Sequence, residues 1–202
     1  MSYVALTRAG TIVPIVGFLE TIGVRPDRVL PAAGLPLWVM DDSEVLIPGA
    51  SPARLFRAAA RHVDLTDLGL MAGERAGIES LGLFGRLVRN APTLGAALET
   101  AARYSTKMTA NRPLQLRPRG DQVELCMSVA DRLDPGDAAW QQDNHFCLGL
   151  MIGVVRLAGG PTWRPAEVHL WTDEAPGLRD SEVLATARIS FRQTETMITI
   201  PR

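Results

Sequence analysis

The side chains best suited to chemistry in this 202-residue chain are three histidines and two cysteines, and they form no recognisable catalytic motif. His62, His145 and His169 lie far apart, and no two have the i, i+4 spacing of a helical metal-binding pair. We interpret His62 as a charge near a helix C-terminus and His169 as an exposed strand residue. Cys126 and Cys147 belong to no CxxC pair and are expected to be small buried apolar residues. The sequence also has no phosphate-binding glycine loop, HExxH or GxSxG, so we expect no enzyme, metal or cofactor.

His145 has the strongest claim to a functional role, because it lies in the polar run 140–145 at the start of an apolar helical stretch. Trp140, Asn144 and His145 would form the mouth of a ligand pocket. Its apolar floor would consist of Cys147, Leu150, Met151 and Val154. The alternative is a solvated helix start, where Asp143 is favoured by the helix dipole. A catalytic pairing of His145 with Asp143 has no partner nucleophile in the sequence.

The helix before this region supplies the other candidates for ligand contact. Tyr104 and Met108 share its apolar face, and methionine suits an adaptable cavity. Arg103 or Arg117 would meet a carboxylate of the ligand. The predicted ligand-binding residues are Arg103, Tyr104, Met108, Arg117, Trp140, Asn144, His145 and Met151.

The elements that must position these residues begin with a helical half. Apolar periodicity predicts helices over 11–22, 26–34, 51–63, 66–77, 81–90 and 93–108. Thr11, Thr66 and Thr93 are the expected N-caps. Glycines punctuate the segments between residues 64 and 104, where we expect them to let helices pack closely.

After residue 110 the period changes from that of helices to that of strands. Alternating apolar residues predict strands at 114–118 and 122–129, joined by a hairpin turn at 119–121. Asp137 is the expected cap of a long helix that runs to about Ala158. Further strands are predicted at 168–172, 189–191 and 197–200. The expected fold is α+β: an N-terminal helical bundle over about residues 10–110, packed on a small, mostly antiparallel sheet with one long helix.

The bulk properties indicate one globular domain without an electrostatic attraction to nucleic acid. The net charge is −1, and 47% of the residues are hydrophobic. Arg112, Arg117 and Arg119 form the richest basic group, but they are spread along a strand and turn, and no helix-turn-helix is evident. The apolar run 11–22 is too short to span a bilayer, and no signal peptide is recognisable. We expect a cytoplasmic protein that does not bind DNA by itself and does not enter a membrane.

An ordered series of short motifs covers most of the chain. They are 64–74 (DLTDLGLMAGE), 81–85 (LGLFG), 91–95 (APTLG), 102–104 (ARY), 160–165 (GPTWRP), 189–191 (ISF) and 197–201 (MITIP). In this order they resemble the N-terminal effector-binding domain of AraC-family transcription regulators, the type called an arabinose-binding domain. The resemblance runs from about residue 12 to residue 202. Nothing resembles a sugar site with aromatic platforms and paired carboxylates, so arabinose is not the expected ligand.

The resemblance implies the effector-binding and dimerisation half of a regulator. It implies a single domain over residues 1–202, with a helical part at about 1–110 and a hairpin–helix–strand part at about 111–202. In that family a C-terminal domain with paired helix-turn-helix motifs follows such a domain, and residues 1–202 do not include it. The expected partners are a small, partly apolar effector such as an organic or fatty acid, a second copy of the chain, and DNA only through the other domain. The alternative is a structural dimerisation module without an effector.

Overall fold

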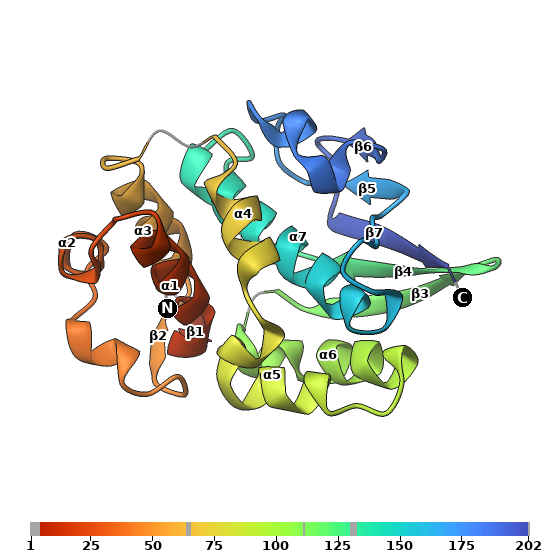
Figure 1. Cartoon of the computed structure of the whole chain (residues 1–202), viewed down its shortest axis with the longest axis horizontal. Coiled ribbons are helices and arrows are strands. Elements are labelled where there is room, and N and C mark those ends of the chain that lie inside the picture. Colours follow the sequence, from red (N-terminus) through yellow and green to blue (C-terminus); the bar gives the residue numbers. More distant parts are fainter. Residues whose placement is uncertain (1–4, 64–65, 111, 130–132, 202) are drawn as a thin grey trace.

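The computed structural model describes residues 5–63, 66–110, 112–129 and 133–201, which form an α+β fold with helices on one side of the main sheet (Figure 1). The α-helices of these residues are α1 (Val13–Thr21), α2 (Pro26–Ala32), α3 (Ser51–Ala59), α4 (Leu68–Arg75), α5 (Gly82–Arg89), α6 (Leu94–Met108) and α7 (Ala138–Gly159). Short 3-10 turns occur at Ala9–Thr11, Leu37–Met40, Ile78–Leu81, Leu178–Asp180 and Glu182–Leu184. The predicted fold class is confirmed.

The main sheet has the strand order β3-β4-β7-β5-β6, which makes the strand nearest the C-terminus its centre. Its strands are β3 (Leu114–Arg119), β4 (Gln122–Met127), β5 (Glu167–His169), β6 (Arg188–Ser190) and β7 (Thr196–Pro201). All neighbours are antiparallel except β5 and β6, so the prediction of a mostly antiparallel sheet is confirmed. Gly120, with φ of 62°, occupies the hairpin turn between β3 and β4.

A second, two-stranded sheet is not apparent from the sequence pattern. β1 (Leu6–Arg8) pairs with β2 (Leu46–Pro48), and Thr7 also forms a bridge to Thr109 at the end of α6. Three-residue strands carry too little alternation to be recognised in a sequence, because their pairing depends on tertiary contacts.

The helix boundaries confirm two of the predicted caps and contradict two. The Thr93 hydroxyl accepts a hydrogen bond from the amide of Ala96, and the Asp137 carboxylate accepts from the first amides of α7. Thr11 and Thr66 are not caps. Helix α1 follows Ile12 without a side-chain cap, and the Thr11 hydroxyl donates to the carbonyl of Arg8 instead. Helix α4 begins two residues after Thr66, whose carbonyl accepts from Gln142.

Helix α7 is the central element, with α4 crossing one side and the main sheet on another (Figure 1). The crossing with α4 is unusually close because glycine lies on both helices. A Cβ atom at Gly69 would overlap the carbonyl oxygen of Gln142, and one at Gly73 would overlap that of Phe146. A Cβ at Gly149 would lie 2.7 Å from the backbone of Gly73. The prediction that these glycines serve packing is confirmed for this crossing.

The apolar interior is divided into two clusters that meet at α7. One lies between α1, α2, α3 and α4, and includes Leu19 and Phe56. The other lies between α6, α7 and the main sheet, and includes Leu125 and Ile198. Cys147 and the neighbouring α7 residue Leu150 pack against both clusters. Helix α7 therefore connects the helical half of the chain to the sheet half.

Candidate functional site

An apolar cavity of about 90 Å³ lies between α6, α7 and the β3–β4 hairpin, and the turn before α5 closes one side. The side chains that line it come from several segments: Ile78, Leu81, Phe84, Ala101, Ser105, Met108, Thr109, Arg112, Leu114, Leu125, Met127, Cys147, Leu150, Met151 and Val154. The four residues that the sequence suggested as an apolar floor are all among them. This cavity is the candidate ligand site, because small-molecule sites are concave, mostly apolar and equipped with few polar groups.

Among the described residues that line the cavity, Arg112 is the charged one, and it is almost completely buried. It lies in the connection between α6 and β3, with 6% of its surface exposed. Its Nη2 donates to the carboxylate of Asp143, and its Nη1 lies 3.2 Å from Sγ of Cys147. Asp143 and Cys147 are one turn apart on α7, so a single guanidinium reaches both. The guanidinium carbon also lies 5.7 Å from the centre of the Trp140 ring.

Burial and charge act in opposite directions on this pair. Burial raises the pKa of the Asp143 carboxyl, and the Arg112 guanidinium opposes that rise. Burial disfavours the charged form of Arg112, but Asp143 and Cys147 raise its pKa above the usual value, so the guanidinium stays protonated. Burial also raises the pKa of the Cys147 thiol to about 11, which makes it a neutral, unreactive wall residue at neutral pH.

The first turns of α7 are buried, and this contradicts the interpretation of a solvated helix start. Asp143, Asn144 and His145 are 3%, 0% and 0% exposed, because the helix lies between α4 and the main sheet along its length. Asn144 exchanges two hydrogen bonds with the hydroxyl of Thr196 on β7. Neither ring nitrogen of His145 has a hydrogen-bond partner among the described residues, and burial lowers the pKa of the imidazole to about 4. His145 is therefore neutral at neutral pH.

The structure brings only some of the predicted ligand-binding residues to the cavity. Met108 and Met151 line it, and Trp140 does not line it but has its ring next to the guanidinium of Arg112. Asn144 and His145 are on the same helix but do not line it. Among the remaining predicted residues, Arg103 and Tyr104 are exposed on α6 and Arg117 is paired with Glu195 on the surface.

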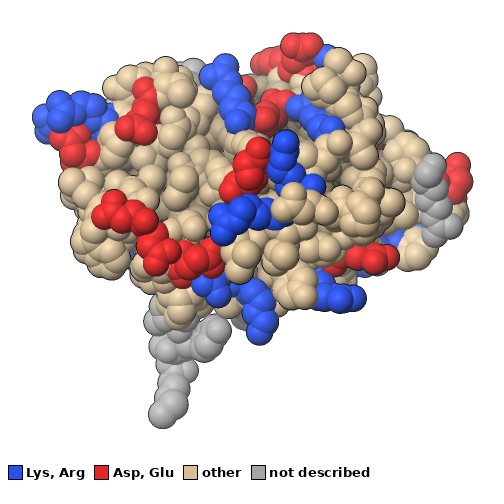
Figure 2. All heavy atoms as spheres, turned by 60° about the horizontal axis from the view of Figure 1, so that its bottom comes forward, with Lys and Arg blue, Asp and Glu red and all other residues tan. Residues whose placement is uncertain are grey.

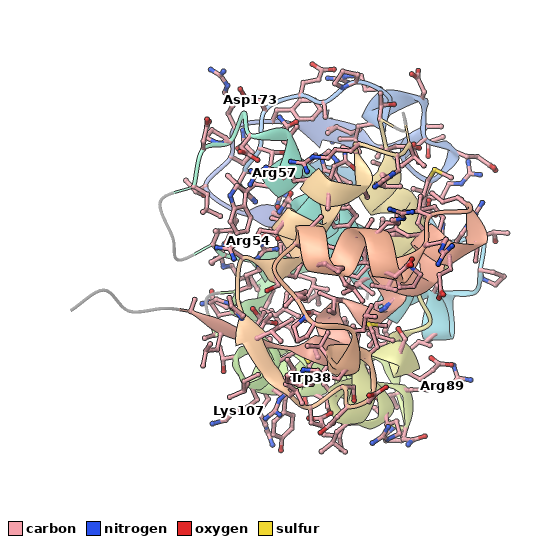
Figure 3. All side chains as sticks on the ribbon, turned by 90° about the vertical axis from the view of Figure 1, so that its left-hand side faces the viewer. Trp38, Arg54, Arg57, Arg89, Lys107 and Asp173 are labelled. Carbon is pink, nitrogen blue, oxygen red and sulfur yellow. The ribbon has the colours of Figure 1, made fainter. Side chains whose placement is uncertain are left out.

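Two further tryptophans and the other two histidines lie outside the cavity wall. Trp163 packs against Gly159 at the junction between α7 and β5. Trp38 is 57% exposed and lies on the outside of the N-terminal half (Figure 3). His62 is exposed, whereas His169 is half-buried, with Nε2 lying 3.3 Å from the carboxylate of Glu167.

Arg112 is the functional candidate that the sequence reasoning missed. The sequence groups it with Arg117 and Arg119 as scattered basic charge, yet the three have different surroundings. Arg117 and Arg119 form exposed ion pairs on the sheet, whereas Arg112 is paired in the interior with a residue 31 positions away. The local signal is its position between the apolar residues Met108 and Leu114, which suggests that its side chain is enclosed.

The surface carries no evident second centre of chemistry in the described part of the chain. Acidic and basic side chains are interspersed on the face that Figure 2 shows. Two of the larger hollows are surface clefts lined by paired charges, Arg57 with Asp137 in one and Arg156 with Glu74 in the other. Within the residues described, no cluster of three metal-ligating side chains occurs. Across the same residues, no helix has the length and hydropathy needed to cross a membrane.

Comparison with known families now places this domain. A model of the arabinose-binding domain of AraC transcription regulators, N-terminal part, matches residues 23–202. The chain therefore belongs to this family, a family of transcription regulators and not of enzymes, and the resemblance inferred from its motifs is confirmed.

A solved structure with the same fold is that of the transcriptional regulator CdpR from Pseudomonas aeruginosa. The TM-score is 0.62 at 17% sequence identity, over 93% of this chain and 53% of that one. The chain thus spans about half the length of that regulator, and the likeness shows the fold alone. No match was found among curated proteins.

Proposed function

We propose that this domain senses a small, largely apolar effector and controls an attached DNA-binding domain of an AraC-type regulator. The observation that carries the proposal is the cavity under α6 and α7, in a chain whose family is that of regulator N-terminal domains. Its wall is built from helices, a hairpin and a turn that are far apart in the sequence. A ligand that fills it would therefore stabilise one arrangement of these elements over others.

The chemistry of the wall favours a mostly hydrophobic ligand. Met108, Met127 and Met151 are flexible and polarizable, so the cavity can adapt its shape to different apolar groups. Ser105 and Thr109, toward the end of α6, are the uncharged polar residues of the wall, and the Ser105 hydroxyl already donates to the carbonyl of Ala102 and accepts from the amide of Leu114. This composition supports an organic acid, alcohol or hydrocarbon-like effector more than a sugar, which needs many paired polar groups.

A thermal-shift screen with a cavity-filling variant tests the proposal. Small organic acids, amides, alcohols and sugars are added to the domain, and a ligand at about 100 times its dissociation constant should stabilise it by about 2.7 kcal/mol. Ala101→Leu, on the cavity wall, should abolish the shift. Ala102→Leu is the matched control, because Ala102 is the next residue of α6 and does not line the cavity. A shift that survives Ala101→Leu would exclude this cavity as the site.

The proposal also includes dimerisation of the domain, which is tested separately from effector binding. Family membership supports a domain that pairs with a second copy, and sedimentation over a range of concentrations measures it. The second candidate function, a structural dimerisation module without an effector, would give a dimer in that experiment and no shift with any ligand class. An effector that changes the dissociation constant of the dimer would favour the sensor.

A further inference from the structure

A buried cation on the wall of an apolar cavity can bind an anionic ligand if the ligand replaces the anion with which the cation is paired. Arg112 is that cation, and its partner Asp143 is 3% exposed. Arginine presents five N–H donors in a planar fork that matches a carboxylate. Arg112 lines the cavity and Asp143 does not, so a carboxylate bound in the cavity would compete with Asp143 for the same guanidinium.

We infer that the effector is a small monocarboxylic acid whose carboxylate binds Arg112 in place of Asp143, while Asp143 takes up one proton from solvent. This inference rests on the proposed function, since it concerns the same cavity. Before binding, the buried pair carries one positive and one negative charge. After binding, the guanidinium pairs with the ligand and Asp143 is a neutral acid, so the buried net charge stays zero.

Proton uptake follows from the cost of buried charge. A second carboxylate beside Arg112 would leave one uncompensated negative charge out of contact with water, which is strongly unfavourable. Two carboxylates that share one site raise the pKa of one of them. Burial already raises the pKa of Asp143. Protonating Asp143 therefore costs less free energy than burying a second negative charge beside Arg112.

The groups around Asp143 keep their protonation states near neutral pH, so Asp143 is the group that takes up the proton. Arg112, from the connection between α6 and β3, stays protonated. Cys147, one turn along α7, has a pKa of about 11 and stays neutral, and His145 on the same helix has a pKa of about 4. Among the described residues, Arg112 is the charged group that acts on the pKa of Asp143.

The size of the cavity limits the apolar part of the acid. An engineered cavity of about 150 Å³ in another protein holds benzene, so a cavity of about 90 Å³ takes a smaller group unless the wall moves. Scaled from the six carbon atoms of benzene, this corresponds to roughly four carbon atoms. Larger acids would need Met108 or Met151 to change rotamer, which methionine does at low cost.

The experiment measures the affinities of butyrate and isovalerate, and of their neutral amides, by calorimetry between about pH 6 and about pH 8. For each carboxylate we expect the dissociation constant to rise about tenfold per pH unit, because one proton is taken up per ligand. The amides should show no such dependence. Repeating the titration in two buffers of different ionisation enthalpy should give about one proton per carboxylate and none per amide. A count of zero for the carboxylates would overturn the inference without any variant.

Asp143→Asn removes the carboxylate that competes with the ligand for Arg112 and tests whether Asp143 takes up the proton. In this variant the guanidinium has lost its competing carboxylate, so carboxylates should bind at least about tenfold more tightly at the upper pH and without pH dependence. A pH dependence that persists in this variant would show that Asp143 is not the group that takes up the proton, and that result would overturn the inference. If the variant is unstable alone, added butyrate should raise its melting temperature more than it raises that of the unaltered domain.

Arg112→Met distinguishes this inference from the proposed function. The variant should lose carboxylate binding by about 100-fold and keep amide binding. If, in the unaltered domain, the amides bind and Ala101→Leu abolishes their binding while no carboxylate binds, the effector cavity stands and the carboxylate exchange is wrong. If no probe of either kind binds, both fail.

Discussion

At the scale of single residues, His145 is the clearest source of pH-dependent stability. Its imidazole is 0% exposed and without a hydrogen-bond partner in the described part of the chain, and burial lowers its pKa from 6.5 to about 4. The unfolded chain therefore binds more protons between these two values. Stability is present above pH 6.5 and is lost as the pH falls toward 4, by an amount on the order of 3 kcal/mol.

We predict that His145→Leu removes most of this acid sensitivity. The check is urea denaturation of both proteins between pH 7 and pH 4. The free energy of unfolding should fall less with decreasing pH in the variant than in the unaltered protein. His62→Gln is the control, because His62 is exposed and should leave the profile unchanged. An acid profile that stays the same after His145→Leu would assign the sensitivity to other groups.

Removing one partner of the ion pair of Arg112 with Asp143 should lower the free energy of unfolding strongly, whereas replacing both partners by apolar residues should lower it little. Arg112→Met leaves the carboxylate of Asp143 buried without its cation, so we expect a loss of about 3–5 kcal/mol. The double variant Arg112→Met with Asp143→Leu should recover most of that loss, because both charges are gone. Equilibrium unfolding of the two single variants and the double variant gives the coupling energy. Additive losses would show that the two side chains do not interact in solution.

At the scale of elements, the crossing of α4 and α7 depends on glycine. We predict that Gly73→Ala destabilises the domain by about 2–4 kcal/mol, because the new methyl group would overlap the carbonyl oxygen of Phe146. Gly153→Ala is the matched control on α7, since a Cβ there meets nothing within 4 Å. It should stabilise the helix by about 0.5–1 kcal/mol. Thermal unfolding measures both, and equal effects of the two substitutions would contradict the close crossing.

The same elements show why some local features were predictable from the sequence and others were not. The caps Thr93 and Asp137 bond to amides within three residues, so the sequence contains all of their partners. Thr66 looks equally suitable, but its carbonyl accepts from Gln142, 76 residues away, and α4 begins later than expected. Element types follow from periodicity, whereas boundaries depend on such distant partners.

The candidate site was predictable only where it depends on residues that are close together in the sequence. The floor residues of α7 share one face of a helix, so their common role follows from helical spacing. The polarity of Asp143 and Asn144 suggested solvent instead, because a sequence does not show that Arg112 and Thr196 satisfy them in the interior. Buried polar pairs between distant segments are the features that a single sequence hides most completely.

At the scale of the whole molecule, helix α7 is shared by the two apolar clusters, and this sharing should make the chain unfold as one unit. Leu19 is buried in the helical cluster, far in sequence from the strands of the main sheet. We predict that Leu19→Ala lowers the free energy of unfolding by about 2–5 kcal/mol. It should also lower the hydrogen-exchange protection of the β4 and β7 amides by the same amount, because the sheet half cannot keep its packing once α7 has lost its neighbours.

Leu46→Ala provides the control, since Leu46 is 58% exposed on β2 and its loss should change stability by no more than about 0.5 kcal/mol. The decisive comparison is between α1 and β4 in the Leu19→Ala variant. Equal loss of protection would mean that residues 1–202 form one cooperative domain, in which a ligand in the cavity can influence the helical half through α7. Loss of protection in α1 with unchanged protection in β4 would divide the chain into two independent units, and the effector cavity would then report only to the sheet half.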